Sequence, residues 1–365
     1  MARRRKRAGL HPIDRLSSLP DELLLIILSF LPTLTAGRTS LLSRRFRHLW
    51  KASPSIDIEL YPYYMKKPKY VAMFNTVLLS RKPSNPLLRL RFKLNCPDSF
   101  DLSHSFISSL LEHASSLGLR HLTIDGYWNF TPCIPTVFSI TSLESLKLPI
   151  CDSIPSGTTL THLKSLSLCL NPTNSAQVER LLLELCCLEH LKLWVSSGVF
   201  SLSSLTIKKL ELNFHSYSAV DSAASARLSM PSLNFLYVES TFFGESTYEH
   251  LPRIHGNIPL LRKSVINLSG IHPEHVAAVA QLLNCISHVE ELSLHLMTWF
   301  NKYPFCNFLE PGKEAPSFSN LKHLDARMCF HEHNFEAVVS LLRQSPALQS
   351  VKLVHMVGLK RMKKK

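Results

Sequence analysis

One leucine-containing word recurs along most of this 365-residue chain and constrains its fold more than any other feature. The word is LxxLxL, in which other apolar residues replace some of the leucines. Ten copies begin at Leu87, Leu119, Leu143, Leu163, Leu188, Ile207, Leu233, Val289, Leu321 and Leu348. Successive copies begin 19 to 32 residues apart, except for one gap of 56 residues that fits two steps with a degraded copy between Leu261 and Leu268. A period of this length predicts one supersecondary unit per copy, and stacked units share one core because no unit is stable alone.

The LxL alternation predicts short strands whose leucines point to one face. The stretches 103–116, 174–186, 273–284 and 334–344, which lie between words, have the pattern of helices and would form an outer layer. This signature is typical of leucine-rich repeats. We therefore predict the α/β class, with a small N-terminal three-helix unit followed by an irregular leucine-rich-repeat solenoid over 87–356. A strand at 56–60 and a loop at 61–69 belong to the linker, 55–86.

Residues between the leucines of each word face the other side of the strand, which in a solenoid is the concave surface. Three of these residues are aromatic and flanked by charges, a combination that is common in binding hot spots. The predicted target-binding residues are Lys192, Trp194, Asn213, Phe235, Tyr237, His295 and Arg327. The alternative for any one of them is a solvated strand face whose aromatics pair across strands.

The stretch from Leu16 to Pro54 predicts three short helices. The first would run from about Pro20 to Phe30, begin with a capping box at Ser18 and end before Pro32. Its apolar residues cover more than one face, so it must be buried on more than one side. A second helix would span 35–42. A third would be capped by Ser43 and end before Pro54. About forty residues are marginal as an isolated domain, so we expect this unit to dock on something.

The same stretch resembles an F-box of the kind found in plant F-box/leucine-rich-repeat proteins. The matching words are Asp14-Arg15, Leu19-Pro20-Asp21-Glu22-Leu23, Ile27-Leu28-Ser29-Phe30-Leu31-Pro32, Thr39-Ser40, Leu42-Ser43-Arg44-Arg45 and Leu49-Trp50. The resemblance implies packing against a Skp-type adaptor, which bridges to a cullin. It also implies a set of residues that form that contact or its supporting core: Leu19, Pro20, Leu24, Ile27, Leu28, Leu31, Leu41, Leu42 and Trp50. Two residues depart from the family pattern: Gly37, where an aliphatic residue is usual, and Phe46, where tryptophan is usual.

The net charge of +14 is concentrated in two short runs. Five charges come from Arg3, Arg4, Arg5, Lys6 and Arg7, and five from basic residues at 360–365, which leaves +4 for the rest of the chain. We interpret 1–9 and 357–365 as basic tails. The first run resembles a nuclear-localisation signal, with a solvated tail as the alternative, so we expect a nuclear and/or cytoplasmic protein. Arginine-rich tails could also contact nucleic-acid phosphates nonspecifically, but the near-neutral body makes nucleic acid an unlikely partner.

Motifs for chemistry are missing from the sequence. It contains no phosphate-binding glycine loop, nucleophile elbow or HExxH word, and glycine is scarce, with 11 residues. The histidines at 272, 275, 331 and 333 lack a second cluster at zinc-binding spacing. The apolar run Leu23–Leu31 is too short to span a bilayer. We expect neither cofactor nor metal, no membrane partner and no catalytic activity.

These observations, with the resemblance, lead to one functional expectation. Residues 10–54 would dock as an F-box on the adaptor, and the repeats would hold an unidentified target protein. The chain would then be the substrate-recognition subunit of a Skp–cullin–F-box ubiquitin ligase. The alternative is a nuclear leucine-rich-repeat scaffold, or a nonspecific nucleic-acid binder that acts through its basic tails.

Overall fold

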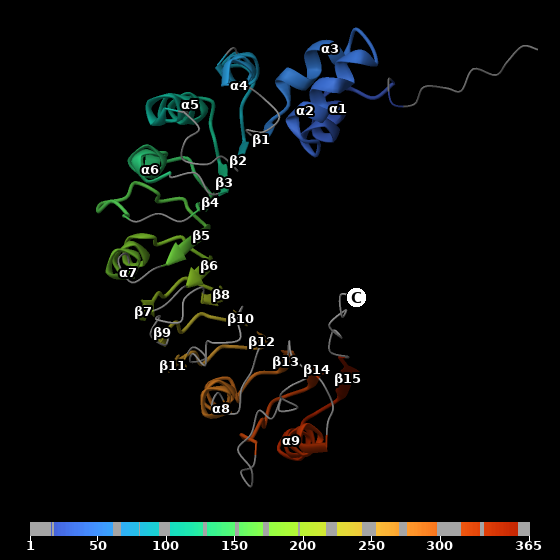
Figure 1. Ribbon diagram of the computed structural model, residues 1–365, viewed down its shortest axis with the longest axis vertical. Helices are drawn as coiled ribbons and strands as arrows, with labels where there is room; N and C mark the ends of the chain where they lie inside the picture. The colour runs from blue at the N-terminus through green and yellow to red at the C-terminus, as the bar shows by residue number, and fades with distance from the viewer. Residues whose placement is uncertain are drawn as a thin grey trace, which may run out of the picture.

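A computed structural model gives the fold of the chain (Figure 1). It describes residues 16, 18–60, 67–79, 81–94, 103–126, 130–149, 153–170, 175–195, 198–216, 225–242, 253–269, 276–297, 315–328 and 332–356. The predicted localisation run Arg3–Arg7 and the C-terminal basic run lie outside these residues.

Parallel strands form one long sheet in which strand follows strand in chain order. Its twelve described strands are β1 (Ser55–Leu60), β2 (Arg89–Leu94), β3 (His121–Gly126), β4 (Ser145–Lys147), β5 (Ser165–Leu170), β6 (His190–Val195), β8 (Lys209–Ser216), β10 (Phe235–Phe242), β12 (Lys263–Ser269), β13 (Glu291–Met297), β14 (His323–Met328) and β15 (Ser350–His355). Each predicted word supplies one strand, and the degraded copy supplies β12. The strand expected at 56–60 is β1, which pairs with β2 and begins the sheet.

The sheet curves into an arc with its strands on the inner side and its helices on the outer side (Figure 1). The outer helices are α4 (Lys67–Phe74) with the π-helix η3 (Asn75–Leu79), α5 (His104–Ser116), the 3-10 turn η4 (Thr131–Cys133) with α6 (Ile134–Phe138), α7 (Ser175–Glu184), α8 (Val276–Cys285) and α9 (Glu332–Arg343). Helices at all four predicted stretches are confirmed. Helix α4 begins inside the stretch predicted as a loop, because Phe74, Val77 and Leu78 anchor this segment in the core.

Three connections between inner strands carry a short strand on the outer side of the arc. These strands, β7 (Val199–Ser203), β9 (Ser225–Ser229) and β11 (Arg253–Asn257), form a second parallel sheet. Gly256 has φ of 152°, and a Cβ atom there would lie 1.9 Å from the carbonyl oxygen of Leu228 on β9. Only glycine fits this close approach of two backbones. The outer layer therefore mixes helices with strands, where the sequence predicted helices alone.

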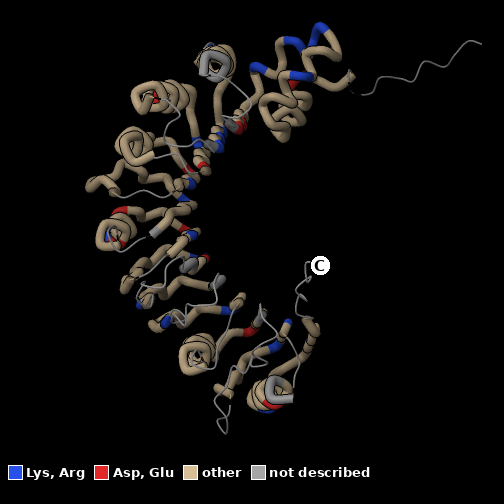
Figure 2. Tube along the Cα trace, viewed as in Figure 1, with Lys and Arg blue, Asp and Glu red and all other residues tan. Residues whose placement is uncertain are grey.

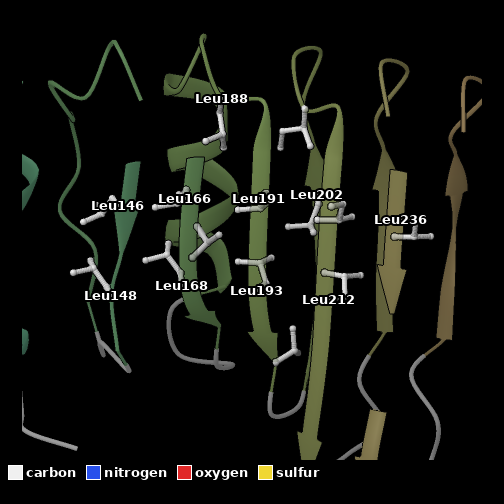
Figure 3. Close-up of a cluster of buried hydrophobic side chains, with 14 of the residues drawn as sticks. Leu146, Leu148, Leu166, Leu168, Leu188, Leu191, Leu193, Leu202, Leu212 and Leu236 are labelled. Atoms are coloured by element: carbon white, nitrogen blue, oxygen red, sulfur yellow. The ribbon is translucent and has the colours of Figure 1, made fainter. Parts of the chain in front are cut away.

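The core is one continuous cluster between the two layers, filled by the leucines of the words (Figure 3). In the words from Leu87 to Leu321 the first residue, such as Leu163 or Leu188, is fully buried, whereas in the last word Val351 and Leu353 are exposed at the end of the sheet. In β12 the second leucine is replaced by Ser264, which is buried and whose hydroxyl has no hydrogen-bond partner. This substitution explains why the copy between Leu261 and Leu268 is hard to recognise in the sequence.

Three short helices precede the sheet at one end of the arc (Figure 1). Helix α1 spans Asp21–Ser29, α2 spans Thr33–Arg38 and continues into the 3-10 turn η1 (Thr39–Leu41), and α3 spans Phe46–Leu49 and continues into η2 (Trp50–Ala52). The N-cap of the third helix is Arg45 and not the predicted Ser43, although the Phe46 amide donates to Ser43 Oγ at 3.3 Å. The capping box predicted for the first helix is wrong: the N-cap is Pro20, with no side-chain cap bond. Asp21 instead accepts from Arg45 Nε at 2.7 Å, which ties the first helix to the third.

Candidate partner-binding surfaces

Helix α1 carries two apolar faces. The inner face buries Leu24 and Leu28 against Ala36 and Phe46, which form the small core of the helical unit. The outer face exposes a stripe at i, i+3, i+4 and i+7: Leu23, Ile26, Ile27 and Phe30. Phe30 is 75% exposed. Leucines from the next two elements are exposed as well: Leu34, Leu41 and Leu42. We call these seven residues the outer apolar surface. Such a concentration on a small unit marks an interaction site.

Trp50 joins the helical unit to the sheet. Its ring packs against both the small core and the continuous core of the sheet. Gly37 lies beneath it, and a Cβ atom at this glycine would meet the ring at 3.9 Å, an ordinary contact. Thr33 adds a polar link, because its Oγ1 accepts from the Asp57 amide of β1 at 2.8 Å. An aromatic side chain shared by two cores fixes the angle between them.

Arg81 fastens the same joint. This side chain is only 7% exposed and donates to four backbone carbonyls. Two belong to the end of the helical unit, Ala52 at 3.1 Å and Ser53 at 2.5 Å, and two to the approach to β2, Asn85 at 2.8 Å and Pro86 at 3.1 Å. Burial lowers the pKa of Arg81 to about 10, so the group stays charged at neutral pH. The guanidinium therefore satisfies carbonyls from both modules at once.

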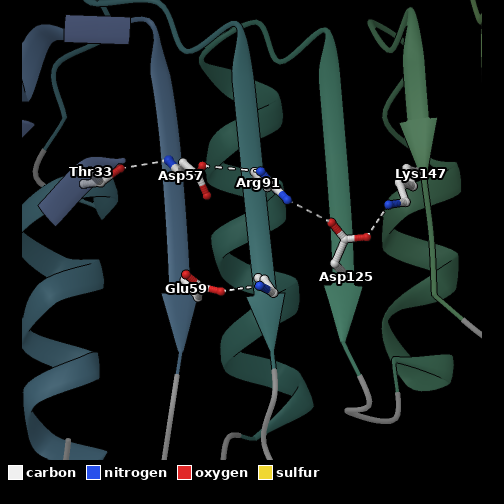
Figure 4. A network of polar contacts seen from close by, with 7 residues as sticks. Thr33, Asp57, Glu59, Arg91, Asp125 and Lys147 are labelled. Atoms are coloured by element: carbon white, nitrogen blue, oxygen red, sulfur yellow. Dashed lines mark hydrogen bonds and ion pairs between the residues drawn. The ribbon is translucent and has the colours of Figure 1, made fainter. Parts of the chain in front are cut away.

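The concave face presents three parallel rows of side chains, because the strands pair in register without slips. At the N-terminal end of the sheet these rows form a chain of ion pairs (Figure 4). Arg91 lies between Asp57, at 3.7 Å, and Asp125, at 3.5 Å, and Asp125 also pairs with Lys147 at 2.5 Å. Glu59 pairs separately with Lys93. Figure 2 shows the same alternation of acidic and basic residues along the inner strands.

Glu211 on β8 is the centre of a second cluster. Its carboxylate contacts Lys192 at 2.9 Å, Lys209 at 2.6 Å and His190 at 3.1 Å. Burial alone would raise the pKa of Glu211, but the hydrogen bonds from Lys209 and Lys192 outweigh it and lower the pKa to about 2. Burial lowers the pKa of His190, so this imidazole is neutral at neutral pH and the two lysines share one carboxylate.

Two of the three predicted concave aromatics, Trp194 and Phe235, lie beside a cation. The ring of Trp194 has Lys192 Nζ at 5.0 Å and Lys147 Nζ at 5.6 Å from its centre, and Phe235 has Lys209 Nζ at 5.2 Å. Cation–π contacts of this kind are worth about 0.5–1 kcal/mol at exposed sites. The aromatic residues and the lysines of the concave face therefore form one connected surface over β4 to β10.

Comparison with known proteins matches residues 16–56 to the F-box domain. The chain carries an F-box domain. Over 97% of its length it is 26% identical to a putative F-box/FBD/LRR-repeat protein of Arabidopsis thaliana, of which it covers 78%. An FBD-associated F-box protein and an F-box/LRR-repeat protein of the same plant are 28% and 27% identical over 93% of the chain, and the chain covers 79% and 78% of them. An F-box domain indicates, in general, binding to a Skp-type adaptor.

The F-box places the residues predicted for adaptor contact in three different environments. Pro20, Ile27, Leu41 and Leu42 are exposed, and Leu19 and Leu31 are half-buried against the small core. Leu24 and Leu28 are buried, so of the two predicted alternatives, contact or supporting core, they belong to the supporting core and are not themselves contact residues. Trp50 belongs to the joint. Sequence reasoning missed four exposed residues, Leu23, Ile26, Phe30 and Leu34, although the spacing of the first three follows one helical face.

The concave residues of this F-box protein need one correction. Asn213 is 2% exposed and its side chain donates to the Leu193 carbonyl at 3.4 Å, so it supports the sheet and does not face a target. Lys192, Trp194, Phe235, Tyr237, His295 and Arg327 are partly exposed, as expected. Arg327 is paired with Asp325 at 2.9 Å. Burial lowers the pKa of His295, whose Nε2 atom has no hydrogen-bond partner. Target binding by these residues stays a prediction.

Metal-binding clusters and membrane-spanning helices are both absent from the described ranges. No group of three or more His, Cys, Asp or Glu residues there is arranged to hold a metal ion. No helix in the same ranges is both long and apolar enough to cross a membrane.

Proposed function

We propose that this F-box protein is the substrate-recognition subunit of a Skp–cullin–F-box ubiquitin ligase. The F-box would bind a Skp-type adaptor through the outer apolar surface and, through that adaptor, a cullin. The observation that carries the proposal is the stripe of Leu23, Ile26 and Phe30 within the stretch that matches the F-box domain. A helix this short cannot cover its own outer face, and burial in a partner removes it from water.

The curved sheet, which we interpret as a leucine-rich-repeat solenoid, would hold the target protein on its concave face. The mechanism is positional: target and ubiquitin-charged enzyme are brought together, and effective concentration replaces chemistry in this chain. The joint at Trp50 and Arg81 supports this mechanism, since a fixed angle between F-box and sheet directs the target to one place. We extend the proposal to a nuclear and/or cytoplasmic location, with Arg3–Arg7 as the localisation signal.

A direct test compares two exposed phenylalanines. Full-length protein is titrated with a recombinant Skp-type adaptor by calorimetry, as wild type, as Phe30→Asp and as Phe335→Asp. Phe335 on α9 is 55% exposed and far along the chain from the F-box, which makes it a matched control. Loss of a central apolar anchor costs about 2 kcal/mol or more, so Phe30→Asp should weaken adaptor binding at least about 30-fold. Equal affinities for all three proteins, or no binding by the wild type, would overturn the proposal.

A further inference from the structure

The concave face has a low strip along β5. The three residues that this strand presents there are all small: Ser165, Ser167 and Cys169. The neighbouring strands present Lys147 on β4 and Lys192 on β6, and the register places Ser167 directly between them. Neighbouring strands lie about 4.8 Å apart, so the two lysines rise about 10 Å apart on either side of a serine.

Trp194 draws the two lysines together over this strip. The ring pairs in register with Cys169, and the ammonium groups of both Lys147 and Lys192 lie within 5.6 Å of its centre. Because Lys147 is two strands away from Trp194, this contact spans β5. The two ammonium groups therefore lie beside one ring from opposite sides of β5, and each also holds a carboxylate on its far side, Asp125 for Lys147 and Glu211 for Lys192.

The hydroxyl at the floor of the strip has no partner. Ser167 Oγ is covered by the side chains around it and forms no hydrogen bond. Lysine side chains at a surface change rotamer within nanoseconds, so this hydroxyl becomes accessible when they turn aside. A hydroxyl left without a partner under two cations is a donor that an anion would satisfy.

The ion-paired side chains around the strip carry a net charge of +1, because they contain one more cation than carboxylates. The two groups of ion pairs beside the strip together contain four permanent cations, Arg91, Lys147, Lys192 and Lys209. They contain three carboxylates, Asp57, Asp125 and Glu211. A single added carboxylate would balance this group, whereas a doubly charged phosphate would leave it negative.

We propose that the strip of β5 between Lys147 and Lys192 binds the carboxylate of a glutamate or aspartate in an acidic segment of the target protein. The two ammonium groups would contact the carboxylate from the sides and the Ser167 hydroxyl would donate from the floor, with Trp194 packing against the neighbouring methylene groups. This inference rests on the proposed function, because it names the class of target segment that the concave face recognises.

The test uses the full-length protein and fluorescent peptides with randomised flanks and a fixed central residue: glutamate, glutamine or phosphoserine. Charge-assisted hydrogen bonds contribute about 1.5–3 kcal/mol, so the glutamate pool should bind about tenfold or more tightly than the glutamine pool. The preference should vanish in the double variant Lys147→Gln with Lys192→Gln. It should persist in the control double variant Lys263→Gln with Lys352→Gln, which removes two other concave lysines that pair with carboxylates, Glu291 and Asp325.

Three results would overturn the inference: equal binding of the glutamate and glutamine pools, a preference that survives in the Lys147 and Lys192 double variant, or tighter binding of phosphoserine than of glutamate. Thermal melting of each variant shows whether the sheet is intact, and Ser167→Val, which keeps both lysines, should reduce the preference on its own. Adaptor affinity is measured on the same preparations. Loss of adaptor binding with an intact glutamate preference would refute the ligase function and not the carboxylate site.

Discussion

The outer apolar surface of the F-box and the concave face of the sheet are both exposed to solvent, yet their side chains differ in what they still lack. Leu23, Ile26 and Phe30 have no way to leave water within the described parts of the chain. On the concave face, Asp125 and Glu211 already hold cations. The apolar side chains of the F-box surface have no partner within the described residues, whereas most charged side chains of the concave face are already paired with one another.

This difference indicates two kinds of binding. Covering an apolar surface gains roughly 25 cal/mol per Å² and depends little on salt. Binding at the concave face exchanges one ion pair for another, and exposed pairs are worth about 0–1 kcal/mol each and are screened by salt. We therefore expect strong, constant attachment at the F-box and selective, salt-sensitive recognition at the sheet.

The largest effect on stability is expected for a substitution on the inner face of α1, and the matching substitution on the outer face serves as its comparison. Leu24→Ala should lower the free energy of unfolding of the F-box by about 2–5 kcal/mol, because it leaves a cavity in a core of few residues. Phe30→Ala, on the outer face, should leave this free energy nearly unchanged. Urea unfolding followed by circular dichroism measures both variants, and equal destabilisation would show that the two faces are not distinct.

The next largest effect on stability is expected for a substitution that breaks the joint between the F-box and the sheet. Arg81→Met removes the donor for the carbonyls of Ala52, Ser53, Asn85 and Pro86. Only the bond to Ser53 is fully buried, and a buried acceptor left without a donor costs about 1–3 kcal/mol. The variant should unfold at lower denaturant, and its F-box should become accessible to protease at residues 52–54 while adaptor affinity is kept. Lys82→Met, at the neighbouring exposed position, is the control. Unchanged cleavage at the joint would contradict the role of Arg81.

A pH titration tests whether the carboxylates of the concave face are stabilised by their neighbouring lysines. The folded-state pKa of Glu211 is lowered from 4.5 to about 2, so its stabilising contribution is fully present above pH 4.5 and is lost as the pH falls toward 2. Glu211→Gln should therefore lose less stability than the wild type between pH 4.5 and pH 2. Melting curves across this range provide the measurement. Parallel losses in both proteins would show that Glu211 is not strongly coupled to Lys192 and Lys209.

The smallest expected effect is a gain in the free energy of unfolding. Ser264 occupies a leucine position of the word in β12, and its hydroxyl is buried without a partner. Ser264→Ala removes that hydroxyl with little change in volume and should raise the free energy of unfolding by about 1 kcal/mol. Ser232→Ala, whose hydroxyl donates to the Leu205 carbonyl at 2.6 Å, should instead lower it, and the opposite signs make the comparison decisive.

The repeating word predicted the inner layer because its evidence is local: alternation within a strand and an aliphatic first residue. The three outer strands had a weaker signal, since Val199–Ser203 also alternates but five residues are too few to separate a strand from a loop. Ser264 shows the other limit. A polar residue in a core position hides the word, and the strand forms because β10 and β13 pair with it on both sides.

The candidate sites were predicted less completely than the fold. The apolar excess of α1 indicated a partner, but assigning Leu24 to the inner face and Phe30 to the outer face requires the positions of Ala36 and Phe46. Arg81 carried no sequence signal, because its partners are backbone carbonyls that come together only in the folded joint. Asn213 sat in a concave register position, yet its side chain turned to the Leu193 carbonyl.

Hydrogen–deuterium exchange of the full-length protein, with and without a recombinant Skp-type adaptor, tests the central claim most directly. The account predicts slower amide exchange in α1 and η1 on adaptor binding, and unchanged exchange in β6, β8 and β10, because the adaptor covers the outer apolar surface and leaves the concave face free for a target. Slower exchange in the concave strands with no change in α1 would contradict it.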